Sequence, residues 1–127
     1  MKILLDARLY GPENTGLGRY VMNLVENLVK IDRRNSYTIL LRKKYFDRLN
    51  LPPKWKKVLA DFKHSGFREQ FMLPRLISEA KPDIVHFPHF NVPIFYSGPF
   101  VVTIHDILMH RQKGLEATTL NPISYLF

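Results

Sequence analysis

Residues 2–31, KILLDARLYGPENTGLGRYVMNLVENLVKI, contain the pattern on which the fold prediction rests. The apolar run at residues 3–5, followed by Asp6, predicts a short strand, and the glycines within residues 11–18 predict a loop. Beyond the loop, apolar side chains at helical spacing predict a long amphipathic helix, and they are Leu17, Tyr20, Val21, Leu24, Leu28 and Ile31. A strand, a glycine loop and a helix in this order form the first part of a βαβ unit.

The rest of the chain continues the alternation of strands and helices. Four further strands are predicted, at residues 37–41, 57–61, 84–87 and 99–104. A second long helix is predicted over residues 67–80, where Pro74 should kink the helix or divide it in two. The side chains expected on its inner face are Phe71, Leu76, Ile77 and Ala80. This order predicts an α/β fold with a Rossmann-like, doubly wound parallel sheet.

Sheets of this kind bind ligands beyond the carboxyl ends of their strands. Three polar or glycine-containing segments follow predicted strands directly. We therefore expect a shared site at this edge of the sheet, formed by residues 11–19, 88–93 and 105–110.

Length and composition favour one globular domain. The chain has 127 residues, of which 46% are hydrophobic and 24% charged, and its formal net charge of +8 favours anionic partners. No cysteine is present, so disulfides and thiol nucleophiles are excluded, and a reducing compartment fits. The first apolar run is too short for a signal peptide, and the longest one, at residues 92–104, is too short to cross a bilayer. We expect a cytoplasmic protein.

The segment TGLGRY, residues 15–20, opens the first predicted helix. Glycines allow a ligand to approach the backbone closely, and the amides at a helix N-terminus attract anions. The segment matches neither the dinucleotide-binding fingerprint nor a P-loop. A tight turn with close helix packing is an equally good interpretation, and both stay open.

Histidines lie in or after the last two predicted strands. His86 is inside an apolar strand, which favours a hydrogen-bonded core histidine, whereas His89 and Asn91 lie in the loop beyond it. His105 and Asp106 stand at the end of the fifth strand, where an imidazole can hold a hydroxyl or act as acid or base. No two histidines have the i, i+4 spacing of a helical zinc site, and we expect no metal.

Four motifs follow one another along the chain: DAR at residues 6–8, GLGRY at 16–20, KPDIVH at 81–86 and VTIHD at 102–106. Together they resemble the N-terminal half of the family 4 glycosyltransferases, over about residues 1–112. The resemblance implies the first half of a GT-B enzyme, in which two Rossmann-like domains enclose the active site. It also implies transfer of a sugar from a nucleotide-sugar donor to a glycan or lipid-linked acceptor, with retention of configuration and without a metal or other cofactor.

The same resemblance implies roles for individual residues. Gly16 and Gly18 would lie against the donor diphosphate and the acceptor, with Arg19 as an anion contact. His105 would contact the donor sugar, and Asp106 would orient its loop. The remaining pair, His89 and Asn91, would help to shape the acceptor pocket.

The family's donor-binding motif, two glutamates eight positions apart, is missing. No pair among the chain's glutamates has that separation, and these are Glu13, Glu26, Glu69, Glu79 and Glu116. Residues 121–127 resemble the first turn of an amphipathic helix. We therefore expect residues 1–127 to form an N-terminal domain that is truncated at its C-terminus and inactive without a donor-binding domain.

A basic cluster, defined as residues 42–44 and 54–57, has Tyr45, Phe46 and Trp55 within or beside it. Because acceptors in this family are often lipid-linked, the resemblance implies that the cluster faces an anionic membrane at its inner surface. A solvated basic face is the alternative. Two other protein classes stay open: a nucleic-acid-binding module, although no nucleic-acid-binding signature is present, and a standalone Rossmann-like binding domain.

Overall fold

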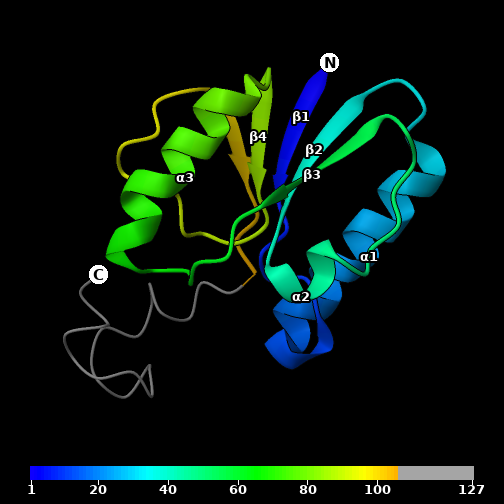
Figure 1. Cartoon of the computed structure of the whole chain (residues 1–127), viewed down its shortest axis with the longest axis horizontal. Coiled ribbons are helices and arrows are strands. Elements are labelled where there is room, and N and C mark those ends of the chain that lie inside the picture. Colours follow the sequence, from blue (N-terminus) through cyan, green and yellow to red (C-terminus); the bar gives the residue numbers. More distant parts are fainter. Residues whose placement is uncertain (106–127) are drawn as a thin grey trace.

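Five parallel strands form one sheet in the computed structural model, which describes residues 1–105 (Figure 1). Their spatial order is β3-β2-β1-β4-β5. The strands are β1 (Lys2–Asp6), β2 (Ser36–Leu41), β3 (Trp55–Leu59), β4 (Ile84–Phe87) and β5 (Phe100–Val102). This is the strand order of the first five strands of a Rossmann fold, so the predicted fold class is confirmed.

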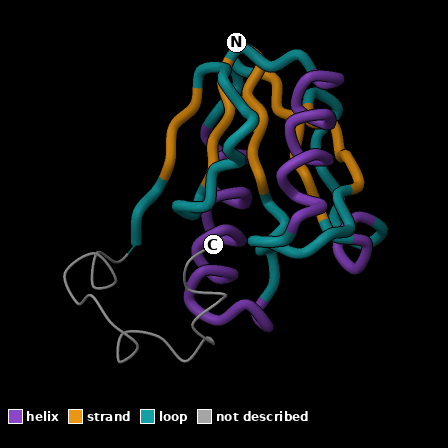
Figure 2. The backbone as a smooth tube through the Cα atoms, turned by 90° about the vertical axis from the view of Figure 1, so that its left-hand side faces the viewer, coloured by secondary structure: helices purple, strands orange, loops and turns teal. Residues whose placement is uncertain are grey.

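Two long helices cover opposite faces of the sheet. Helix α1 (Thr15–Ile31) follows β1, and α3 (Phe67–Ala80) follows β3. Figure 1 shows them on either side of the strands, and Figure 2 shows the strands running side by side in one layer. The remaining helical elements are short: the 3-10 turn η1 (Pro12–Asn14) and the single turn α2 (Lys43–Phe46).

Alternate residues of β1 and β2 enter two separate cores. In β1, Leu5 packs with Val21 and Val25 of α1, whereas Leu4 packs with Leu73 of α3. The same alternation in β2 places Ile39 with the first core and Leu40 with the second. Both faces are covered, which explains why the strands are continuously apolar in sequence rather than alternating.

The inner face of α3 differs from the prediction. Leu73 and Ile77 are buried, and Leu76 and Ala80 pack against the same core, but Phe71 is 66% exposed. Glu69 is completely buried one turn before Leu73. A helix that presents positions 69, 73 and 77 to the sheet turns position 71 to solvent, so the predicted inward Phe71 was wrong.

Pro74 lies inside α3 and does not divide it. A proline removes one backbone donor, which costs helix stability. Leu73 and Ile77 are buried on either side of the proline, and this burial holds one continuous helix together. Of the two predicted effects of Pro74, a kink or a division, the division into two short helices was therefore wrong.

The bounds of β3 and β5 differ most from the prediction. β3 covers residues 55–59 rather than 57–61, and β5 covers residues 100–102 rather than 99–104. At the start of β3, Trp55 pairs with Tyr37 of β2, and their rings stack with centroids 4.1 Å apart, a cross-strand contact that stabilises this end of the strand. Within residues 1–105, no helix combines the length and the apolar character needed to span a bilayer.

Unfolding experiments should distinguish the observed face of α3 from the predicted one. Leu73→Ala leaves a cavity in the second core and should lower the free energy of unfolding by about 2–5 kcal/mol. Phe71→Ala removes only an exposed ring that stacks on Phe95, and the expected loss is about 1 kcal/mol or less. Urea denaturation of both variants measures the difference, and equal losses would contradict the observed orientation of α3.

Candidate functional site at the carboxyl edge of the sheet

The chain segments that follow β1, β4 and β5 meet at one edge of the sheet. The ring of His105 lies beside Tyr20 in α1, with ring centroids 4.5 Å apart. Its Nε2 lies 2.7 Å from the carbonyl oxygen of Pro88, in the loop after β4. In the order β3-β2-β1-β4-β5, the strands after β1 are added first on one side of β1 and then, from β4 on, on its other side. In parallel sheets, ligands bind in the crevice at the point where the strand order reverses in this way. The expected meeting of the three segments is therefore seen as far as residue 105.

The contact with Pro88 determines which nitrogen of His105 carries the proton. A carbonyl oxygen only accepts hydrogen bonds, so Nε2 must be the donor. In the neutral ring Nδ1 is then the acceptor. His105 is exposed, and this acceptor suits a ligand hydroxyl.

The glycines of the loop after β1 have different surroundings. Gly18 is buried, and a Cβ atom there would collide with the carbonyl oxygen of Gly11. Gly16 faces open space. The tight-packing interpretation therefore applies to Gly18, whereas a ligand can approach the backbone at Gly16. Arg19, which follows Gly18, is exposed.

The N-terminus of α1 has no side-chain cap. Asn14 occupies the N-cap position, but its Nδ2 donates to the carbonyl oxygen of Leu9 instead of capping the helix. Backbone amides at a helix N-terminus carry a partial positive charge and need acceptors. The start of α1 is therefore suited to an anionic group.

Two histidines of the β4 segment have distinct environments. The Nε2 atom of His86 lies 2.9 Å from Oγ1 of Thr103, which confirms a hydrogen-bonded histidine within the sheet. The ring of His89 lies against that of Phe90, with ring centroids 4.2 Å apart, and its Nδ1 is buried without a hydrogen-bond partner among the described residues. Burial lowers the pKa of His89, and the nearby His64 and His105 lower it further, so the neutral ring is favoured.

A buried ion cluster lies behind this edge, and the sequence did not reveal it. The Nε and Nη2 atoms of Arg8 donate to the two carboxylate oxygens of Asp6 at 2.8 and 2.6 Å. Nη2 also donates to Oε1 of Glu69 at 2.6 Å. All three side chains are almost completely buried. Burial alone would raise the pKa of Asp6, but the Arg8 guanidinium holds that pKa well below its usual range.

Two loops attach to the same cluster through Glu69. Its Oε2 accepts hydrogen bonds from the backbone amide of Ser65 at 2.6 Å and from Nδ2 of Asn91 at 2.7 Å. The loop before α3 and the loop after β4 are thereby tied together. Asn91, expected near an acceptor, uses its amide nitrogen inside this cluster.

Asp6, His64 and Glu69 place their ligand atoms within 4.8 Å of one another, the spacing of a metal site. Arg8 already donates to both carboxylates, so a metal ion would have to displace a buried guanidinium. The donor set suits the ion cluster better than a cation. Of the expected site residues, Asp106 lies outside the described residues, as do the rest of residues 106–110 and the helix expected at residues 121–127.

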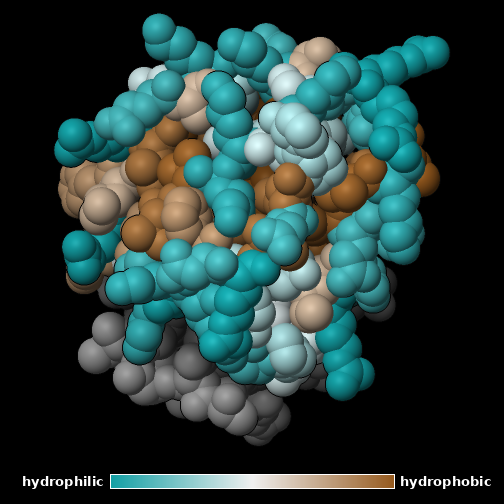
Figure 3. Space-filling model, turned by 45° about the vertical axis from the view of Figure 1, so that its right-hand side comes forward, coloured by the Kyte–Doolittle hydropathy of each residue, from teal (hydrophilic) through white to brown (hydrophobic). Residues whose placement is uncertain are grey.

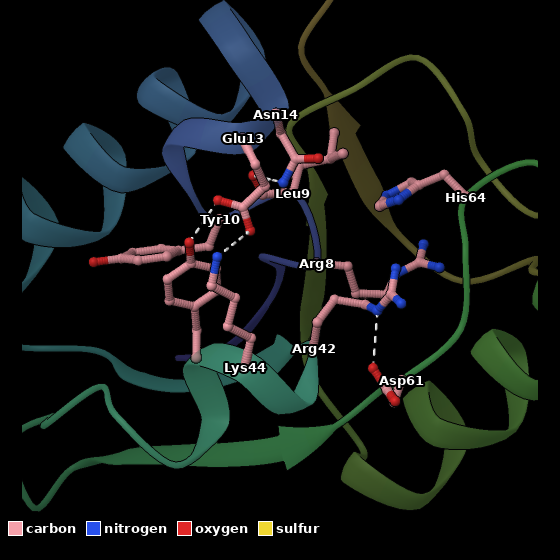
Figure 4. A pocket seen from close by; sticks show the side chains of 10 residues that line it. Arg8, Leu9, Tyr10, Glu13, Asn14, Arg42, Lys44, Asp61 and His64 are labelled. Carbon is pink, nitrogen blue, oxygen red and sulfur yellow. Dashed lines mark hydrogen bonds and ion pairs between the residues drawn. The ribbon is translucent and has the colours of Figure 1, made fainter.

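A hollow of about 240 Å³ opens between the loop after β1 and α2 (Figure 4). Its lining includes Glu13 and Asn14 from the segment after β1, and Lys44 and Tyr45 from α2. Arg42 and Asp61 form an ion pair on its wall at 3.0 Å. The one-turn helix α2 was not predicted, because its four residues, KKYF, are too few to show a helical period.

The aromatic residues of the basic cluster point into the protein rather than outward. Trp55 is 7% exposed, and Tyr45 and Phe46 pack against the first core. Lys57 donates to the carbonyl oxygens of Phe46 and Leu49 at 2.7 and 2.9 Å. The exposed cations of the cluster are Lys43, Lys44, Lys54 and Lys56.

The structure defines the class of the protein: an α/β domain with a Rossmann-like parallel sheet. No particular family follows from comparison, since no family model, curated protein or solved structure matches the chain. The functional assignment therefore depends on the geometry of the carboxyl edge.

Removing the arginine of the buried cluster should strongly destabilise the protein. Arg8→Ala leaves Asp6 and Glu69 buried without their cation, and the expected loss in the free energy of unfolding at pH 7 is about 3–5 kcal/mol. The matched control is Arg75→Ala, which breaks an exposed ion pair with Glu79 and should cost about 0.5 kcal/mol or less. Equal effects would contradict a stabilising role for the cluster.

The loss caused by Arg8→Ala should shrink as the pH falls. In the wild type the lowered pKa of Asp6 contributes stability above the pKa of the unfolded chain, and this contribution is lost as the pH falls below it. Without Arg8, burial raises the pKa of Asp6 above that of the unfolded chain, so the variant is already relieved by protonation at pH values where the wild type still keeps its contribution. Urea denaturation at pH 7 and pH 4.5 measures the free energy of unfolding of the wild type and of Arg8→Ala. If the difference between the two proteins is the same at both pH values, the linkage is contradicted.

Proposed function

We propose that the chain is the N-terminal, acceptor-side domain of a retaining, metal-independent glycosyltransferase with GT-B architecture. The donor is a nucleotide-sugar, and the acceptor is a glycan or a lipid-linked sugar. Most donor contacts belong, in this proposal, to a second domain that carries the paired glutamates. The alternatives are a nucleic-acid-binding module and a standalone Rossmann-like domain.

The observation that carries the proposal is the position of His105 beside the start of α1. The Tyr20 ring contacts the His105 ring one turn after Gly16, so the uncapped helix start and the imidazole share one edge of the sheet. An anion site beside a hydroxyl acceptor suits the two ends of a sugar–phosphate bond. The four sequence motifs, in their order along the chain, support the same function.

The chemistry of retaining sugar transfer requires this pairing. Breaking a sugar–phosphate bond develops positive charge on the sugar ring and negative charge on the departing diphosphate. Backbone amides fixed at the start of α1 stabilise the developing negative charge without reorganisation. Nδ1 of His105 accepts a hydrogen bond from a sugar hydroxyl and holds the ring in position.

Titration with nucleotide-sugars, followed by amide NMR, tests the proposal. UDP-glucose and GDP-mannose should shift the amides of Gly16, Tyr20 and His105, with a Kd on the order of 1 mM because a single domain supplies few contacts. His105→Ala removes one hydrogen bond to the sugar and should weaken binding roughly twofold to tenfold. The control is Lys81→Ala, because Lys81 is exposed and follows the C-terminal end of α3. This variant should bind with unchanged affinity.

Two results would contradict the proposal. Shifts confined to surfaces away from Gly16 and His105 would separate the ligand from the proposed site. A gel shift with nucleic acid that persists at physiological ionic strength, and that weakens with added salt, would favour the nucleic-acid-binding alternative.

An anionic membrane surface is the proposed location of a lipid-linked acceptor. Because Trp55 is buried and Tyr45 and Phe46 pack inward, the contact would be electrostatic rather than insertive. Lys44 is exposed but pairs with Glu13, and the other exposed cations of the cluster are Lys43, Lys54 and Lys56. Figure 3 brings the side of α1 forward, and hydrophilic side chains project over much of this face.

Flotation with vesicles tests the electrostatic contact. Replacing Lys43, Lys54 and Lys56 together by alanine should lower recovery with anionic vesicles, at about 1 kcal/mol for each charge. The matched control replaces the exposed cations Lys63, Arg68 and Arg75, which lie before and along α3, and should recover like the wild type. Equal recovery of the wild type with neutral and anionic vesicles would remove the membrane from the proposal.

A further inference from the structure

The hollow beside α2 has a lining whose charges are paired internally. Arg42 pairs with Asp61 at 3.0 Å, and Nζ of Lys44 lies 3.4 Å from Oε1 of Glu13. Two cations and two carboxylates therefore balance each other. The lining also includes Arg8, whose charge is opposed by Asp6 and Glu69 behind it. The protein as a whole has a charge of +8, so this balance is local and does not reflect the composition.

A balanced lining of this kind favours an uncharged polar ligand over a polyanion. A diphosphate would be repelled by the carboxylates of Glu13 and Asp61 or would have to break both ion pairs. A sugar hydroxyl both donates and accepts hydrogen bonds, and each ion pair offers a donor and an acceptor side by side. Neighbouring hydroxyls of one ring match that arrangement.

The carboxylate of Glu13 is held in place before any ligand arrives. Its Oε2 accepts a hydrogen bond from the Tyr45 hydroxyl at 2.6 Å, and this bond lowers the pKa of Glu13, with help from Lys44. Glu13 is therefore ionised at neutral pH. Figure 4 shows the Glu13 carboxylate in contact with Lys44, with the Arg42–Asp61 pair on the adjoining wall. Prepositioned polar groups of this kind cost little ordering entropy on binding.

The size and the aromatic wall of the hollow also suit one sugar ring. Its volume of about 240 Å³ is below the range of roughly 300–1,000 Å³ typical of drug-sized ligands. The partly exposed ring of Tyr45 lines the hollow and offers an apolar surface to the C–H groups of a sugar, and the buried ring of Tyr10 supports it from behind, with ring centroids 5.1 Å apart.

We propose that the hollow between the loop after β1 and α2 binds one uncharged sugar ring of the acceptor glycan. Glu13 and Asp61 accept hydrogen bonds from its hydroxyls, and Arg42 and Lys44 donate to them. The inference rests on the proposed function, because that function supplies the reason for a saccharide at this edge of the sheet. It adds the class of group that the acceptor presents: a neutral saccharide rather than a phosphate.

Amide NMR of the full chain tests the inference with methyl glycosides of glucose, galactose, mannose and N-acetylglucosamine, each titrated to tens of millimolar. At least one should shift the amides of Glu13, Lys44 and Asp61. Glu13→Gln keeps the shape and removes the charge, so it should weaken that binding about tenfold or more, the loss expected for a hydrogen bond to a charged group. The matched control, Glu79→Gln, alters a carboxylate paired with Arg75 on α3 and should leave the affinity unchanged.

The comparison ligand is inorganic pyrophosphate, which should leave the amides of the hollow unshifted. The inference is overturned if pyrophosphate shifts them in place of the glycosides, if no glycoside shifts them, or if both glutamate variants behave alike. An unchanged amide spectrum of Glu13→Gln outside the hollow shows that the variant is folded.

The failure of this inference is distinguishable from the failure of the proposed function. Nucleotide-sugars report on Gly16, Tyr20 and His105, whereas the glycosides report on Glu13, Lys44 and Asp61. Shifts by nucleotide-sugars without shifts by glycosides overturn the inference alone. Shifts by glycosides without shifts by nucleotide-sugars support a saccharide site and overturn the donor side of the proposed function.

Discussion

The contact between Arg8 and its two carboxylates is the constraint on which the functional edge depends. It joins three segments that are distant in sequence: the end of β1, the first turn of α3 and, through Asn91, the loop after β4. Each partner is buried, so none of the three charges is tolerated without the others. The cluster therefore fixes the relative positions of these segments more strictly than apolar packing would. His105 depends on this arrangement because its Nε2 contacts Pro88, three residues before Asn91.

Much of the fold was predictable because it follows from apolar patterns. All five strands and both long helices correspond to apolar runs or helical spacing in the sequence, and burial on both faces accounts for the continuous runs. The inner face of α3 was not predictable in this way. Charged residues are usually exposed, so Glu69 was not among the residues predicted on the inner face, whereas Phe71 was. Only the position of Arg8, 61 residues away in sequence, makes a buried Glu69 favourable.

The candidate site was predictable in location and less so in detail. Parallel strands place their carboxyl ends together, which is why the loops after β1, β4 and β5 were expected to meet. The glycine motif, by contrast, could not be interpreted residue by residue. Gly18 meets the Gly11 carbonyl, whereas Gly16 faces open space, and this difference depends on how the loop folds back on the helix. The spacing of two residues between Gly16 and Gly18 does not indicate how the loop at Gly11 packs against the helix.

The two ionic arrangements at this edge differ in burial, and this difference separates their roles. Around Arg8 the charges are excluded from water, so opening the pair would leave a bare charge in the interior, and the arrangement is rigid. In the hollow, the side chains of Arg42, Asp61, Lys44 and Glu13 remain between 37% and 53% exposed. Water already competes for these groups, so exchanging part of their hydration for a ligand's hydroxyls costs little. The buried Arg8 cluster therefore provides a rigid frame. The exposed ion pairs of the hollow can exchange partners and provide an adaptable binding surface.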